Sequence, residues 1–103
     1  MRGLTLGMKP RVTVSINRDG QFELYLNESG RDLLVAELQK LDRKWEHFHL
    51  DNFGDPAIEF ATDVPLSVVP YGEEDKVFKH GKVLLRPDEW DEEYYPHVMK
   101  TED

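Results

Sequence analysis

The stretch of sequence that decides the fold is RVTVSINRDGQFELYL, residues 11–26. Apolar residues alternate with polar ones on both sides of a central turn: Val12, Val14, Ile16, Phe22, Leu24 and Leu26. This period of two is typical of half-buried strands. Gly20 closes the turn and can adopt the positive φ that other residues resist. The stretch therefore predicts an antiparallel β-hairpin that turns its apolar face to the core.

A helix is expected next, from about Ser29 to Arg43, with Asn27 or Ser29 as its N-cap. Its apolar residues fall at helical spacing and predict a face that packs on the sheet: Leu33, Leu34, Val35, Leu38, Leu41 and Trp45. Four polar residues are expected to face water: Arg31, Glu37, Gln39 and Lys40.

The second half of the chain predicts short strands and a last helix. A strand is expected over residues 46–51, with Phe48 and Leu50 on one side. Further short strands are expected near residues 58–61, 64–69, 77–78 and 83–85, the last two joined by a tight turn at 79–82. A short helix is expected to begin at 86–89 and to stop before Pro96.

These elements predict one α+β domain over residues 1–103. We expect a mostly antiparallel sheet with an N-terminal β-hairpin, one main helix packed on one face, and a short C-terminal helix. Residues 1–10 are expected to be a loose arm and 97–103 a tail. The expected core comprises Val12, Val14, Ile16, Phe22, Leu24, Leu34, Leu38, Leu41, Phe48 and Leu50.

Composition narrows the classes of function. The formal net charge of −8 disfavours binding to nucleic acid or to an anionic membrane surface. No run of apolar residues is long enough for a secretory signal or a membrane span. The chain has no cysteine, which excludes disulfides and thiolate metal sites and fits the reducing cytoplasm.

The C-terminal segment is the strongest candidate for a binding surface. Carboxylates and aromatic rings are interleaved there: Asp88, Glu89, Trp90, Asp91, Glu92, Glu93, Tyr94 and Tyr95. Such a patch can attract a basic partner and supply rigid aromatic anchors. The alternative is a solvated helix whose Trp90 and Tyr94 pack on the sheet. A second acidic stretch, residues 73–75, would extend the patch if the fold brought it near.

A metal site is the competing interpretation. His47 and His49 alternate along the expected strand, and Asp51 follows on the same side. His80 or His97 would have to complete the set of ligands. The same residues fit the solvent or interface face of a half-buried strand better than a metal site, because a third ligand is not identified, and we favour no metal and no cofactor.

Enzymatic machinery is not recognisable in the sequence. The serines lack a nucleophile elbow, the glycines form no phosphate-binding loop, and no carboxylate pair stands out. We therefore expect a protein that is not an enzyme.

A family resemblance gives further information on the function. Hairpin, helix and strand carry an ordered pattern: Gly20, Phe22, Leu24, Asn27, Gly30, Leu34, Leu38, Leu41 and then HFHLD at 47–51. From Gly20 to Asp51 the chain resembles the immunity protein 32 family, small α+β proteins found beside bacterial polymorphic toxins. The resemblance implies a bacterial, cytoplasmic toxin inhibitor that acts by protein–protein interaction.

The leading hypothesis is thus an immunity protein that binds and neutralises a cognate toxin, itself basic, through the acidic and aromatic C-terminal segment. Two alternatives stay open. One is a small metal-binding protein or metal-dependent enzyme that uses the His-x-His strand. The other is an oligomeric scaffold subunit that pairs through a strand edge at 64–69 or 83–85.

Overall fold

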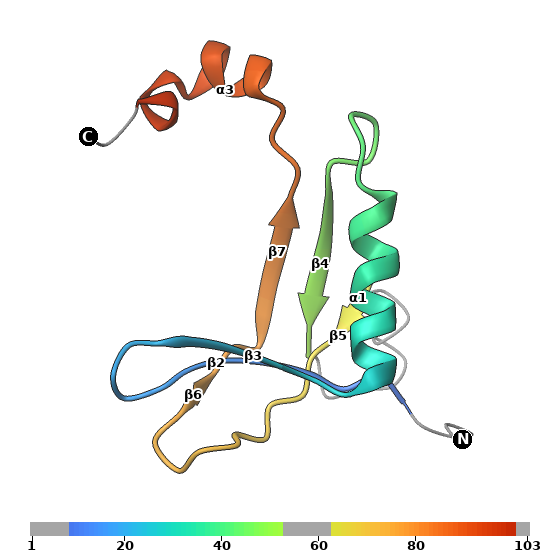
Figure 1. Ribbon diagram of the computed structural model, residues 1–103, viewed down its shortest axis with the longest axis vertical. Helices are drawn as coiled ribbons and strands as arrows, with labels where there is room; N and C mark the ends of the chain where they lie inside the picture. The colour runs from blue at the N-terminus through green and yellow to red at the C-terminus, as the bar shows by residue number, and fades with distance from the viewer. Residues whose placement is uncertain (1–8, 53–62, 101–103) are drawn as a thin grey trace.

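The computed structural model describes residues 9–52 and 63–100 and has the expected α+β class (Figure 1). Its elements, in chain order, are β2 (Val12–Ile16), β3 (Phe22–Leu26), α1 (Glu28–Lys40), β4 (His47–Asp51), β5 (Val64–Pro65), β6 (Lys76–Val77), β7 (His80–Leu84), α3 (Asp88–Tyr94) and the 3-10 helix η1 (Pro96–Met99). The strand expected at 58–61 lies outside the described residues.

The strands form two small sheets instead of one. The first has the order β3-β2-β6 and is antiparallel, and the second has the order β5-β4-β7, with β5 parallel and β7 antiparallel to β4. The division arises because β6 joins β2 whereas β7, only two residues later, joins β4. The tight turn expected at 79–82 is therefore wrong, since residues 80–82 belong to β7.

The expected hairpin is confirmed. β2 and β3 pair from Val12 opposite Leu26 to Ile16 opposite Phe22. Gly20 has a φ of +84° in the turn, and the Asn17 side-chain oxygen accepts the backbone N–H groups of residues 19 and 21. An asparagine that bonds to the following backbone in this way favours a turn over continued strand.

The expected apolar face of the hairpin is buried at Val12 and partly buried at Val14, but the opposite, polar face of β2 is buried as well. Thr13 and Ser15 are fully buried, whereas Phe22 leaves 64% of its surface exposed. The loop before β6 lies against this polar face, where Tyr71 stacks on Tyr25, the residue opposite Thr13, with ring centroids 3.9 Å apart. The apolar residues of β3 are left exposed: Phe22, Leu24 and Leu26.

The core is smaller than expected and gathers around β4. Within the described residues its buried apolar members are Val12, Phe48, Leu50, Val64 and Leu66. Partly buried residues pack against them: Val14, Leu33, Leu34, Leu41 and Val83. Of the expected core, Ile16 is half-buried, and three residues are exposed: Phe22, Leu24 and Leu38.

Helix α1 ends at Lys40, three residues before its expected end at Arg43. The Asp42 carboxylate accepts hydrogen bonds from the backbone N–H groups of Lys44 and Trp45, and such a local turn competes with the helix. Trp45 consequently lies outside the helix with 58% of its surface exposed. Glu37 was expected to face water, but it is buried and its carboxylate accepts a bond from Lys40 at 2.9 Å.

The first turn of α1 is tied to the start of β2. The Asn27 side-chain oxygen accepts the backbone N–H of Gly30 at 2.7 Å and that of Arg11 at 2.8 Å. Its side-chain amide donates to the carbonyl of Lys9 at 2.9 Å. Asn27 thus caps the helix, as one of the two expected candidates, and fixes where it meets the sheet.

Gly30 is required by this close approach. A Cβ atom at this position would collide with the backbone carbonyl of Arg11. We predict that Gly30→Ala lowers the free energy of unfolding by about 1–3 kcal/mol, the usual cost of overpacking. Urea denaturation measures the loss, and Ser29→Ala in the same turn is the matched control. Equal stability of the Gly30 and Ser29 variants would show that the helix does not need this contact.

The buried hydroxyl groups of the hairpin suggest a stabilising change. Neither Thr13 Oγ1 nor Ser15 Oγ has a hydrogen-bond partner in the described structure. Since burying an unpaired hydroxyl is costly, Thr13→Val, of the same shape, is expected to raise the free energy of unfolding by about 1 kcal/mol. Thr13→Ser keeps the hydroxyl, loses a methyl group and should lower stability. A loss of stability in the valine variant, measured in urea, would mean that the hydroxyl is satisfied in solution.

Candidate functional site

The candidate surface lies on α3, which begins after Pro87 and ends at Tyr94, as expected. Its backbone bonds start at the Pro87 carbonyl, which accepts the N–H groups of residues 90 and 91. Five of its seven residues are acidic. We call Asp88–Tyr95 the α3 surface. The segment after it was expected to be a tail, but Pro96–Met99 forms η1.

The α3 surface stands away from both sheets, at the upper end of β7 in Figure 1. Its closest packing among the described elements is with η1. Trp90 is half-buried, whereas Tyr94 leaves 67% of its surface exposed. The alternative in which Trp90 and Tyr94 pack on the sheet is therefore not what the structure shows.

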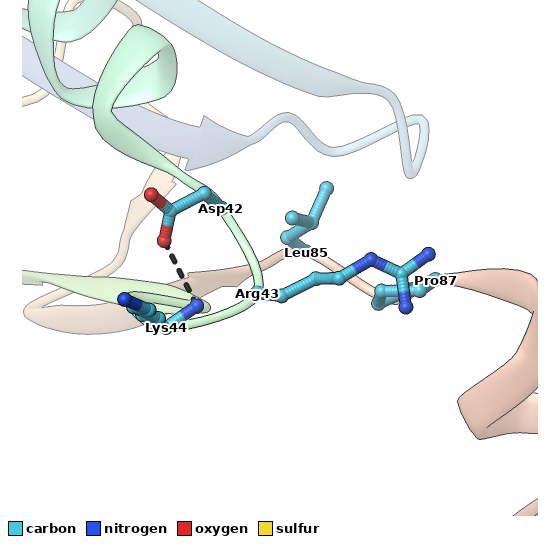
Figure 2. A pocket seen from close by; sticks show the side chains of 5 residues that line it. All are labelled: Asp42, Arg43, Lys44, Leu85 and Pro87. Atoms are coloured by element: carbon cyan, nitrogen blue, oxygen red, sulfur yellow. Dashed lines mark hydrogen bonds between the residues drawn. The ribbon is translucent and has the colours of Figure 1, made fainter.

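One arginine connects the body of the protein to α3. Arg43 follows α1, and its guanidinium donates to both carboxylate oxygens of Glu89, at 2.9 and 3.2 Å. Figure 2 shows the Arg43 side chain extending past Leu85 toward Pro87, along an open cavity of about 660 Å³. This contact orients α3 relative to the turn at residues 42–45.

The pKa of the Glu89 carboxyl lies below its ordinary value. The first cause is the hydrogen bond to its own backbone N–H, and the second is the bond and charge of Arg43. A lowered pKa keeps Glu89 ionised, which suits electrostatic attraction and not proton donation.

A second arginine, Arg86, lies two residues before α3 and binds one of its carboxylates. Arg86 donates to Asp91 Oδ1 from Nε at 2.9 Å and from Nη2 at 2.8 Å. Its guanidinium carbon lies 5.8 Å from the ring centroid of Trp90 and 5.1 Å from that of Tyr95. These distances permit cation–π attraction, which restricts both rings before any partner arrives.

Three carboxylates of the α3 surface remain available. Asp88, Glu92 and Glu93 are exposed and make no ion pair with another described residue. Tyr94 and Tyr95 lie beside them and are exposed as well. The surface thus combines unpaired negative charge with aromatic area, whereas Glu89 and Asp91 serve to position it.

The second acidic stretch does not extend this surface. Glu73, Glu74 and Asp75 lie beside the hairpin turn, where Arg18 pairs with Glu74 at 3.3 Å. Figure 1 places the loop before β6 at the opposite end of β7 from α3. The two acidic regions are therefore separate.

The histidines of β4 lie on the face opposite the core, as expected, with their rings 5.0 Å apart. His47 Nδ1 lies 2.9 Å from a carboxylate oxygen of Glu46, a bond that is the main cause of the lowered pKa of Glu46. The His49 backbone N–H donates to Asp63 at 2.8 Å. Asp51 pairs with His80 in the β4–β7 register.

Metal-ligating side chains do not converge in the described part of the chain. Among residues 9–52 and 63–100, which the structure describes, no group of three or more histidines and carboxylates is arranged to hold a metal ion. His97 lies on η1, next to Tyr95. The described helices also include none that is long and apolar enough to cross a membrane.

The comparisons with known proteins return nothing. No family model matches the chain, and no curated protein or solved structure matches it either.

Sequence reasoning missed the residues that position the α3 surface. Arg86 stands five residues before Asp91, so its contact was a local signal that the sequence carried. Arg43 gave no such signal, because it is 46 residues from Glu89. The apolar residues of η1, Val98 and Met99, were also not singled out, and both are exposed.

The Arg43 contact predicts a measurable change in proton affinity. In Arg43→Ala the Glu89 carboxyl should titrate at higher pH than in the parent protein, because one of the two causes of its lowered pKa is removed. The pKa of Glu89 is lowered in the folded protein, so the ionised carboxylate stabilises the folded state at pH values above the ordinary carboxyl pKa. That stabilisation disappears as the pH falls through the lowered value.

Carbon-detected NMR titration of the Glu89 side chain measures this shift. The control is Arg18→Ala, which removes an exposed arginine that pairs elsewhere. An unchanged Glu89 titration in Arg43→Ala would show that the contact does not form in solution.

Proposed function

We propose that this protein is a non-enzymatic binding protein whose α3 surface binds a basic protein partner. The observation that supports this most directly is the set of unpaired carboxylates, Asp88, Glu92 and Glu93, beside the exposed Tyr94 and Tyr95. A helix that contributes this little to the core is free to contact another molecule.

The positioning of α3 supports the same function. Arg43 and Arg86 each use two hydrogen bonds to hold one carboxylate. Arg86 also lies over the rings of Trp90 and Tyr95. A surface that is ordered in advance loses less conformational freedom on binding, which favours affinity.

The overall charge supports a basic partner. At a net charge of −8 the protein attracts cationic surfaces over distances longer than a contact, and this raises the rate of association. Aromatic side chains in contact with the partner then slow dissociation, because they bury a large area.

The resemblance over residues 20–51 supplies the class of partner. Proteins of the family that it resembles are predicted to neutralise bacterial toxins, so we propose a cognate toxin as the partner and the bacterial cytoplasm as the compartment. A toxin that acts on nucleic acid has a basic substrate-binding surface, and an acidic helix can occupy that surface in place of the phosphates.

This function predicts how neutral substitutions change binding. Replacing the carboxylates that make no ion pair with a described residue, in Asp88→Asn/Glu92→Gln/Glu93→Gln, should weaken binding to the proposed cognate toxin by at least about tenfold. It should also reduce the dependence of affinity on salt. Titration calorimetry at low and high salt measures both quantities, and survival of cells that co-express the toxin measures neutralisation.

The matched control is Glu73→Gln/Glu74→Gln/Asp75→Asn, which removes the same three charges at the other acidic region. This control should retain the affinity of the parent protein to within about threefold, because it changes only the long-range field. Equal affinity of both triple variants would contradict the assignment of binding to α3.

A further inference from the structure

A second surface lies open on the body of the protein, between the two sheets. It is an apolar groove of about 370 Å³, and its lining includes Phe22, Leu24, Leu34, Leu50, Phe78 and Val83. Phe22 and Phe78 are exposed, as is Leu24. Apolar area of this kind, concentrated in one concave place, is typical of a site that another molecule covers.

The groove is bordered by the one basic stretch of the second half of the chain. Residues 76–82 have the sequence KVFKHGK, with three lysines, one histidine and no acid. His80 and Lys82 line the groove, and all three lysines are exposed. None of the three makes an ion pair with a described residue. A fitting occupant therefore carries both apolar side chains and negative charge.

The α3–η1 segment, residues 88–99, has this combination. Asp88, Glu92 and Glu93 supply unpaired charge, and exposed apolar side chains follow them: Tyr94, Tyr95, Val98 and Met99. The charges of the segment are opposite to those of residues 76–82. The segment and the groove therefore have opposite charges, and each of them also exposes apolar side chains to solvent.

The two surfaces cannot meet within one chain. β7 and residues 85–87 connect them, and this stretch is extended and forms hydrogen bonds with β4 and Glu46. Eight extended residues span about 26 Å. Figure 1 accordingly shows α3 at one end of β7 and β6 near the other. Contact between them requires a second molecule.

We propose that the α3–η1 segment of one copy docks in the apolar groove of a second copy, with Glu92 and Glu93 facing the lysines of residues 76–82. Because each copy has both surfaces, the exchange is reciprocal and closes as a symmetric dimer. The dimer uses Asp88–Tyr95, so a basic partner and the second copy compete for it. The proposal does not rest on the proposed function, since it needs only this chain.

Charge reversal on either side tests the dimer. Sedimentation velocity on the purified protein should show a monomer–dimer equilibrium that shifts toward monomer as salt increases. Lys79→Glu/Lys82→Glu and, separately, Glu92→Lys/Glu93→Lys should each weaken the dimer by at least about tenfold, because like charges then face each other. Circular dichroism of each variant shows that it remains folded.

The decisive step is to mix the two variants. In the mixed dimer one contact is as in the parent protein, and the other has both charges reversed and still attracts. We expect the equimolar mixture to recover dimer to within about threefold of the parent dissociation constant. The control is Glu73→Lys/Glu74→Lys, which makes the same charge change away from the groove and should leave the dimer intact.

Three results would overturn the proposal: a parent protein that stays monomeric up to high micromolar concentration, charge reversals that leave the dimer unchanged, or a mixture that stays monomeric. Loss of toxin binding in the α3 variant leaves this experiment unaffected, since no toxin is present. Lys79→Glu/Lys82→Glu separates the two proposals further, because it should disrupt the dimer and retain toxin binding.

Discussion

The burial of one face of β4 is the constraint on which the rest of the structure depends. Residues of β2, α1 and the segment after β5 pack in one cluster with Phe48 and Leu50. The backbone enforces the same convergence, since the N–H of Leu66 donates to β4 at Asp51 and the N–H of Ser67 donates to β2 at Val12. Without this face, the two sheets would have no common core.

A core this small leaves much of the chain outside it. The Cα radius of gyration is 16.4 Å, against about 13 Å for a compact domain of this length. Figure 1 shows that α3 and η1 stand off the body of the protein.

Local patterns predicted the elements, and long-range packing decided their faces. The turn at Gly20, the cap at Asn27 and the start of α3 each follow from single residues. These features could therefore be predicted from the sequence. The packing of the loop before β6 on the polar face of the hairpin does not follow from the local sequence, because Tyr71 and Tyr25, which stack there, are 46 residues apart. The acidic residues of α3 were visible in the sequence, whereas the contact from Arg43 that orients them requires the fold.

The central claim is that α3 and η1 are a binding element and not part of the core. Native-state hydrogen exchange on the protein at low concentration tests this most directly. The account predicts that the amides of residues 90–98 exchange through local opening, much faster than those of Phe48 and Leu50 and independently of mild denaturant. Protection equal to that of β4, lost only on global unfolding, would show that α3 is packed into the body and would contradict the account.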